Sequence, residues 1–370
     1  MKHVLKVCAA LLLCLACTYS ASACTIPYSS RGIEPIGSTV EIVSQDEDSV
    51  TLRKTDDSAP FKILMFTDLH LAVLDKKHSS REHVRTLEML VKNIQREKPD
   101  LVLFGGDNVT SRFNFLRSHQ FARILEKLGV YWGGIIGNHE GDNIWSIRRS
   151  RMVKIFSSYD HCIMRQGKAD VDGDCNYSIR ILNKDGSLRH AFFCLDTFDG
   201  MSEEMKKEHG IVSDKFVYDV IKQSQIDWYS AQVQAMKRTF GAFTSAVLIH
   251  VPLTQFADAA ALVEQGKAQF LYGDKREGVC AAGFDSGMFA AIKDGGVTQT
   301  VFCGHDHLNN FGVLYDGITL SYIEPSGYGA YGMAKLDAPE SEWLQGYTRL
   351  LLGSDGTYTH EQFRNSAIAA

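Results

Sequence analysis

The chain has 370 residues, of which 45% are hydrophobic and 22% are charged, and its formal net charge at pH 7 is −5. This length and composition are typical of a globular protein with a large core, either one big α/β domain or two small ones. The slight negative charge and the absence of a Lys/Arg block argue against a protein that coats nucleic acid. Small anionic substrates stay open, because bound metal ions can attract them.

The first 23 residues have the pattern of a cleaved signal peptide. Lys2 and Lys6 form a basic start, the apolar run VCAALLLCLAC is too short to span a bilayer comfortably, and Ala21-Ser22-Ala23 is a small-residue cleavage signal. We therefore expect an exported protein, periplasmic or extracellular, whose mature chain starts at Cys24. A lipid anchor on Cys24 is an alternative, although Ala21 stands where a lipobox prefers Leu. No second long apolar run follows, so we expect no transmembrane helix.

Residues 24–60 are polar and predict an N-terminal extension with two edge strands, Thr39–Val43 and Ser49–Lys54. From Phe61 onward, apolar strand-like runs alternate with amphipathic segments, which predicts βα units. The expected elements of the first half are the strands FKILMFT, LVLFGG and WGGII and helices over 81–97, 116–128 and 144–156.

The second half is richer in strands. Its expected elements are strands over 176–182, 190–195, 245–250 and 298–303, helices over 224–237 and 284–292, and hairpins over 312–320 and 347–358. We see no internal repeat or linker, so residues 61–370 are expected to form one catalytic domain. Cys162 and Cys175 flank a Gly/Asp-rich loop, where a local disulfide is plausible in an exported protein. Cys194 and Cys303 lie in apolar runs and are expected to be buried thiols.

Five short polar motifs each follow an apolar, strand-like run. They are Asp68-Leu69-His70, Gly106-Asp107, Gly137-Asn138-His139-Glu140, His250 and Gly304-His305-Asp306-His307. Because rigid α/β scaffolds present their chemistry on loops at strand ends, we expect these motifs to converge on one site. Each motif alone is explained as well by a turn or a core histidine. Their joint occurrence indicates a metal site.

The residue types suit divalent or trivalent ions such as Fe, Mn or Zn, and no Cys is among them. The candidate ligands are Asp68, His70, Asp107, Asn138, His250, His305 and His307. Asp107 can bridge two ions, because a carboxylate has two oxygens. Two ions can lower the pKa of a shared water and hold a phosphate for in-line attack. His139, beside Asn138, is well placed to give a proton to the leaving group.

The motifs resemble the calcineurin-like metallophosphoesterase superfamily, whose pattern is D-x-H, G-D, G-N-H-[D/E], H and G-H-x-H. The closest resemblance is to its short purple-acid-phosphatase-like group, which includes small plant phosphatases and the yeast cell-cycle regulator phosphatase. FKILMFTDLHL, EKPDLVLFGGDN, IGNHE and VFCGHDHLNNF carry the resemblance, which extends roughly from Phe61 to Gly332. It implies a four-layer α/β/β/α sandwich with two metal ions at the strand ends.

The resemblance also implies which residues hold each ion. One ion would be held by Asp68, His70, Asp107 and His307, and the other by Asp107, Asn138, His250 and His305. His139 matches the catalytic histidine of the family. Purple acid phosphatases have a metal-binding Tyr three residues after the bridging Asp, where this chain has Thr110. We therefore expect no tyrosinate–iron charge-transfer band. The superfamily's protein phosphatases have Asp at that position, so Thr110 also argues against a Ser/Thr protein phosphatase.

From these observations we expect an exported, two-metal hydrolase of small phosphate monoesters, with a metal-bridging hydroxide as nucleophile and His139 as proton donor. A phosphodiesterase acting on cyclic nucleotides or glycerophosphodiesters is an alternative, because both reactions use the same metals. A metal-binding protein without turnover is another. The loss of a ligand or of His139 would favour that reading, and none is lost.

Overall fold

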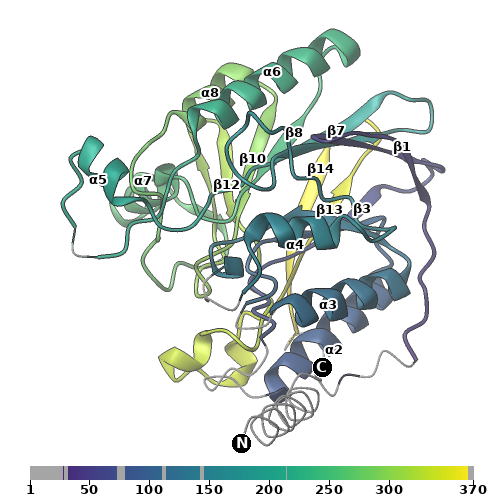
Figure 1. The fold of residues 1–370 in the computed structure, drawn as a ribbon, viewed down its shortest axis with the longest axis horizontal. Helices are drawn as coiled ribbons and strands as arrows, with labels where there is room; N and C mark the ends of the chain where they lie inside the picture. Colours follow the sequence, from purple (N-terminus) through teal and green to yellow (C-terminus); the bar gives the residue numbers. More distant parts are fainter. Residues whose placement is uncertain are drawn as a thin grey trace, which may run out of the picture.

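The computed structural model describes Tyr28 and residues 32–72, 80–110, 114–141, 146–213 and 215–365. The predicted signal peptide and Cys24 lie outside these residues. Two mixed β-sheets face one another, and helices cover the outer face of each sheet (Figure 1). This arrangement confirms the predicted four-layer α/β/β/α architecture. Within the described part of the chain, no helix combines the length and the apolar character needed to cross a membrane.

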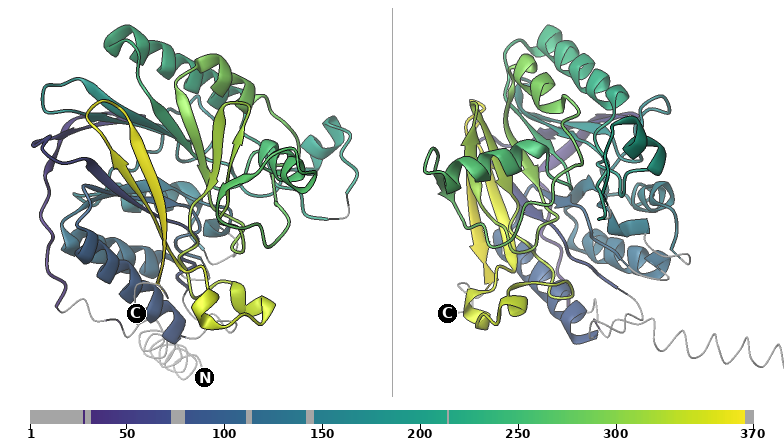
Figure 2. Two further views of the ribbon diagram at one scale, coloured as in Figure 1. Left: turned by 180° about the vertical axis from the view of Figure 1, so that it is seen from behind. Right: turned by 90° about the vertical axis from the view of Figure 1, so that its left-hand side faces the viewer.

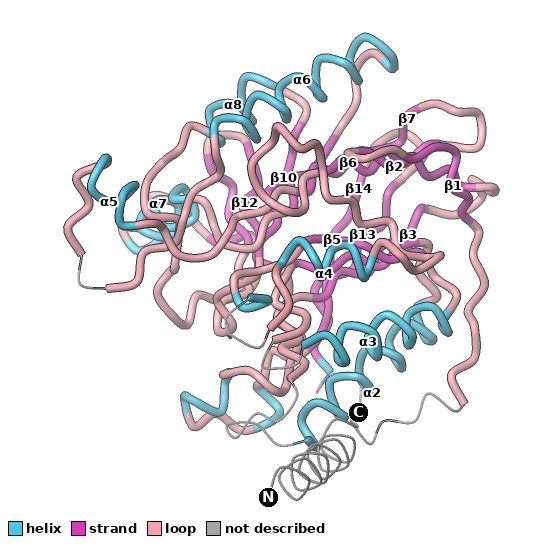
Figure 3. Tube along the Cα trace, viewed as in Figure 1, coloured by secondary structure: helices cyan, strands magenta, loops and turns pink. Residues whose placement is uncertain are grey.

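The smaller sheet has five strands in the order β14-β13-β3-β4-β5. Their bounds are Phe61–Phe66 for β3, Leu101–Gly105 for β4, Tyr131–Ile135 for β5, Gly346–Leu352 for β13 and Tyr358–Arg364 for β14. Strands β3, β4 and β5 are parallel, as the βα alternation predicts. Helices α2 (Ser80–Glu97), α3 (Asn114–Leu128) and α4 (Arg149–Phe156) lie on its outer side (Figure 3).

The larger sheet has nine strands in the order β1-β2-β6-β7-β8-β10-β12-β11-β9. Their bounds are Val40–Gln45, Ser49–Lys54, Tyr177–Leu182, Leu188–Cys194, Ser245–Leu248, Thr298–Cys303, Ile318–Tyr322, Gly312–Tyr315 and Phe270–Tyr272 in that order. Helices α6 (Gln223–Phe240), α7 (Thr254–Glu264) and α8 (Met288–Gly295) pack outside it, and α5 (Glu203–Glu208) stands at the side of the molecule (Figure 2).

Strand β8 shows why the central strands are apolar throughout. Ala246 and Leu248 belong to the core between the two sheets, whereas Val247 and Ile249 belong to the core under the helices. Alternate side chains of a strand point to opposite faces, so a strand covered on both faces needs apolar residues at every position. The run SAVLI therefore predicts a fully buried strand, and all five of these residues are buried.

Several expectations need correction. The segment Ser49–Lys54 is not an edge strand, because β2 lies between β1 and the distant β6, with which it pairs in parallel. The helix expected over 144–156 begins at Arg149, although residues 142–145 lie outside the described part. The predicted disulfide is wrong, since Cys162 and Cys175 are both free, buried thiols. Cys194 and Cys303 are buried free thiols, as expected.

Candidate metal centre

The five motifs meet where the parallel strands of both sheets end. The loops after β3, β4 and β5 come from the smaller sheet, and the loops after β8 and β10 come from the larger one. A short parallel bridge between Thr67 and Pro325 ties the two sheets together beside the site. The structure therefore brings together seven side chains that span 240 residues of sequence, from Asp68 to His307.

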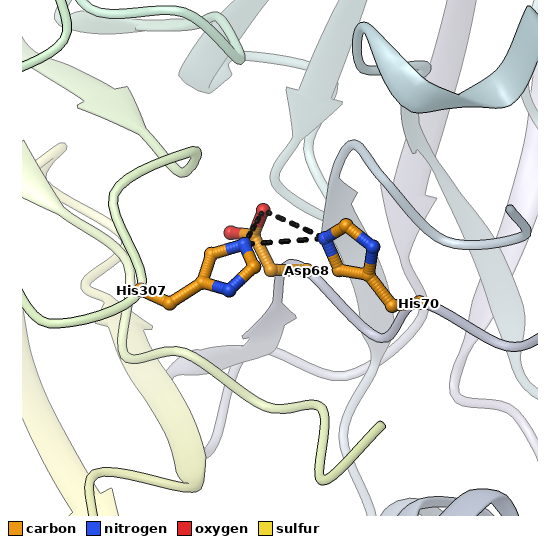
Figure 4. Close-up of side chains that lie close together, drawn as sticks. All are labelled: Asp68, His70 and His307. Carbon is orange, nitrogen blue, oxygen red and sulfur yellow. Dashed lines mark hydrogen bonds and ion pairs between the residues drawn. The ribbon is translucent and has the colours of Figure 1, made fainter. Parts of the chain in front are cut away.

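One group comprises Asp68, His70 and His307, whose candidate ligand atoms all lie within 4.8 Å of one another. The Nε2 atom of His307 is 3.2 Å from Asp68 Oδ1 and 3.2 Å from His70 Nε2. Asp68 Oδ1 is 3.8 Å from His70 Nε2. The two imidazole rings and the carboxylate converge on one point from opposite sides (Figure 4).

The second group comprises Asp107, His250 and His305, whose ligand atoms also lie within 4.8 Å of one another. His250 Nε2 is 3.2 Å from Asp107 Oδ2 and 3.1 Å from Asn138 Oδ1, so Asn138 joins this group. Asp107 Oδ2 is also 3.4 Å from His70 Nε2 in the first group. Asp107 thus lies between the two groups, where a bridging ligand is expected.

Two buried carboxylate oxygens face these nitrogens without a hydrogen-bond partner, namely Asp68 Oδ1 and Asp107 Oδ2. A buried charged oxygen is costly unless it is paired or coordinates a metal. The other oxygen of each carboxylate is held: Asp68 Oδ2 accepts from Thr67 Oγ1 at 2.8 Å and from the His305 N–H at 3.0 Å. Asp107 Oδ1 accepts from the His139 N–H at 2.9 Å. The residues therefore fit two cations, one beside each free oxygen.

Hydrogen bonds also orient two of the histidines. The Nδ1 atom of His250 lies 2.8 Å from the Gly105 carbonyl, and the Nδ1 atom of His307 lies 2.9 Å from the Tyr331 carbonyl. A carbonyl only accepts, so Nδ1 carries the proton in both rings and Nε2 is left to bind a metal.

The backbone at these loops is strained in a way that marks a functional site. Only eight non-glycine residues among those described have a positive φ, and four of them are predicted ligands: Asp68 at 56°, His70 at 45°, Asp107 at 52° and His305 at 80°. Such conformations are costly for residues with a Cβ and persist where surrounding contacts enforce them. The contacts that aim these side chains at the site are thus strong enough to hold an unfavourable backbone.

Glu140 and Arg149 brace the loops, and neither was predicted for that role. The buried Glu140 carboxylate accepts from the Asn108 N–H at 2.6 Å and from the Gly137 N–H at 2.9 Å, next to Asp107 and Asn138. Arg149 forms a close ion pair with Asp196 and donates to the Gly137 carbonyl. The position of Glu140 in the G-N-H-E motif could have indicated its contacts with the loops. Nothing in the sequence connects Arg149 to the site.

The acidic and basic side chains of the site shift one another's pKa values. Burial works against ionisation of Asp68 and Asp107, but the facing histidines hold the pKa of each carboxyl below its usual range. Burial also works against protonation of His250, yet Asp107 raises the pKa of that imidazole to about 10. In His305, burial and then the charge of His250 lower the pKa to about 3. Protons on the histidines therefore compete with metal ions, and acid disfavours metal binding.

His139 lies at the rim of the site, partly exposed, at the start of the short helix η1 (His139–Gly141). Its ring centroid is 5.5 Å from that of His70. Tyr331 stacks on His307 with ring centroids 4.2 Å apart, and Tyr218 meets His305 edge-on at 4.4 Å. These two tyrosines form outer walls of the two groups, one beside each.

The comparisons with known proteins agree with this geometry. A model of the calcineurin-like phosphoesterase family matches residues 61–309, which include all seven candidate ligands and His139. The chain belongs to this family. Its predicted family resemblance is thereby confirmed.

The curated relatives that match this chain have low sequence identity to it. The chain is 28% identical over 301 residues to "Probable inactive purple acid phosphatase 14" of Arabidopsis thaliana, covering 74% of this chain and 72% of the relative. It is 27% identical over 286 residues to "Phosphatase DCR2" of Saccharomyces cerevisiae, covering 72% of this chain and 47% of the relative. A crystal structure of a dimetal phosphatase from Danio rerio is 13% identical, with a TM-score of 0.48, over 83% of this chain and 100% of that one. At that level the structural similarity says nothing about function.

Proposed function

We propose that the protein is an exported hydrolase of small phosphate monoesters that uses two metal ions. The observation that carries this proposal is a pair of buried carboxylate oxygens without a hydrogen bond, Asp68 Oδ1 and Asp107 Oδ2, each 3.2 Å from a histidine nitrogen. Membership of the phosphoesterase family supplies the reaction class. The proposal that the protein is exported rests on the sequence pattern of residues 1–23 alone. An exported protein anchored by a lipid on Cys24 is the alternative form of this proposal.

In this proposal Asp68, His70, Asp107 and His307 hold one ion, and Asp107, Asn138, His250 and His305 hold the other. Bound ions would activate a water molecule and hold the phosphate oxygens for in-line attack. The Gly105 and Tyr331 carbonyls fix the rings of His250 and His307 so that Nε2 of each faces the centre. The backbone N–H of His139 donates to Asp107 Oδ1. This contact holds the His139 side chain near the substrate, where it protonates the leaving oxygen.

A binding protein without turnover is the second candidate, because several Arabidopsis relatives carry names that call them probably inactive. Against it, this chain keeps every predicted ligand and the proton donor, and the fold brings the ligands together. A phosphodiesterase is the third candidate, since diesters need the same centre.

The test compares turnover of para-nitrophenyl phosphate with that of bis-para-nitrophenyl phosphate, with the bound metal quantified. Wild type is compared with His139→Ala and with His161→Ala, a control at the opposite end of β5 where His161 pairs with Glu126. We expect monoester turnover that falls about 10²–10⁴-fold in His139→Ala, the range for a lost general acid, and that persists in the control. Preference for the diester would favour the phosphodiesterase, and two bound ions without turnover of either ester would favour the binding protein.

A further inference from the structure

Tyr218 lies beside the second group of ligands, on the segment that leads from α5 to α6. Its ring meets the His305 ring edge-on, with an interplanar angle of 88° and centroids 4.4 Å apart. Phe216, which is exposed to solvent, packs edge-on against Tyr218 with centroids 5.0 Å apart. The three rings therefore form a row that leads from the surface to a predicted metal ligand.

Two neighbouring segments hold the backbone of Tyr218. The residue forms an antiparallel bridge with Gly200 and a parallel bridge with Ala282. Its carbonyl accepts from the Gly283 N–H at 3.0 Å. A side chain that extends from paired backbone varies little in position, which suits a group that must meet a substrate at a fixed point.

The hydroxyl of Tyr218 has no hydrogen-bond partner among the described residues, and it is not buried. By contrast, the Tyr331 hydroxyl donates to Glu277 at 2.9 Å, and the Tyr322 hydroxyl donates to Asp306 at 2.5 Å. A tyrosine whose ring is largely covered usually finds a partner for its hydroxyl. The Tyr218 hydroxyl is therefore available to a ligand.

This hydroxyl also lies in the electrostatic field of the metal centre. Burial raises the pKa of Tyr218 most, and the charges of Cys280, Asp306 and Asp107 raise it further. Asp107 is the predicted bridging ligand, so the field at the bridge reaches the hydroxyl. A phenol keeps its proton at neutral pH and donates it in a hydrogen bond, and the charged oxygens of a phosphate are strong acceptors.

We infer that the Tyr218 hydroxyl is a substrate-binding group that donates a hydrogen bond to an oxygen of the phosphate. His139 lies beside His70 in the first group, and Tyr218 lies beside His305 in the second. His139 thus serves the leaving oxygen, and Tyr218 serves an oxygen that stays on phosphorus. The inference rests on the proposed function, because it requires that the centre holds a phosphate.

The test measures the binding of inorganic phosphate to the Zn²⁺-loaded full chain by calorimetry, with the bound metal quantified. Wild type is compared with Tyr218→Phe, which keeps the ring against His305 and loses only the hydroxyl. We expect two ions on both proteins and a phosphate affinity about 10–100-fold weaker in the variant, the range for a hydrogen bond to a charged group. Tyr315→Phe, which removes a partly exposed tyrosine hydroxyl on β11, should bind phosphate as tightly as wild type.

A measurement on wild type alone keeps the test valid if the variant fails to fold. Saturating phosphate should slow the nitration of Tyr218 by tetranitromethane, because the bound oxygen covers the hydroxyl, and should leave the nitration of Tyr315 unchanged. Unchanged nitration of Tyr218, or equal phosphate affinity in wild type and a two-ion Tyr218→Phe protein, would overturn the inference and leave the metal centre intact. Fewer than two ions on wild type would instead overturn the proposed function, and this inference with it.

Discussion

Replacing Glu140 by Ala should destabilise the metal-free protein strongly, although Glu140 is not a predicted ligand. The substitution leaves two buried N–H groups, those of Asn108 and Gly137, without an acceptor. Each unpaired buried donor costs about 1–3 kcal/mol, so the loss in the free energy of unfolding should be roughly 2–6 kcal/mol. Burial and then the charge of Asp107 raise the pKa of Glu140 to about 8, so the metal-free carboxyl is mostly neutral at pH 7. The predicted loss is therefore a loss of acceptors rather than of charge.

The assay is urea unfolding of the chelator-treated protein, with Glu140→Gln as the matched variant and Glu264→Ala as the surface control. Glu140→Gln keeps one acceptor, so it should lose about half as much, roughly 1–3 kcal/mol. Glu264 pairs with Lys275 at an exposed position, so its removal should change stability by less than about 0.5 kcal/mol. If Glu140→Ala is as stable as the Glu264→Ala control, the bracing role assigned to Glu140 is wrong.

Two further predictions concern Gly106 in a ligand loop and the buried Glu324. An alanine Cβ at Gly106, where φ is +98°, would lie 2.6 Å from His250 Nδ1, so Gly106→Ala should bind at least one metal ion fewer per chain by elemental analysis. Gly186→Ala, at φ +88° with open space around it, should keep the full metal content, and equal losses in both would contradict the argument. Burial raises the pKa of Glu324 to about 7, so stability should be fully present below about pH 4.5 and fall by about 3 kcal/mol as the pH rises through 7. Unfolding near pH 5 and pH 8 should show this fall in wild type but not in Glu324→Gln, and the same fall in both would refute it.

The positions of the site residues could be predicted because each motif follows an apolar run that forms a buried strand. FKILMF and TVFC became β3 and the end of β10, and the residues after them lie at the sheet edge. The division of the ligands into two sets came from the family resemblance, and their observed grouping agrees with it. The role of each residue as a ligand stays a prediction until metal binding is measured.

The features that sequence reasoning missed depend on contacts between distant segments. Strand β2 is internal because it pairs with β6, and that partner is more than a hundred residues away. The positive φ of Asp68 and His305 arises in the assembled loops and leaves no trace in residue type. Arg149 reaches the Gly137 carbonyl only once α4 packs behind the site. Short elements such as α5 and β9 carry too few residues for a periodic pattern.

Asn108 and Tyr331 illustrate the same limit, because the sequence is compatible with a pocket role and with a core or turn role for both. In the structure Asn108 is buried and its side chain donates to the Ile135 carbonyl at 3.2 Å. The Tyr331 ring instead stacks on His307. Which face of a loop meets the site is decided by packing, and neither residue type specifies it.

The number of metal ions that each chain binds tests the central claim most directly. Equilibrium dialysis against Zn²⁺ or Mn²⁺ should give two ions per chain for wild type, one for Asp68→Asn, and weakened binding of both for the bridging Asp107→Asn. Asp306→Asn is the control, because Asp306 lies between His305 and His307 but accepts from Tyr322 Oη at 2.5 Å, and it should still bind two. Fewer than two ions on wild type, or two undiminished ions on Asp68→Asn and Asp107→Asn, would contradict the proposed centre.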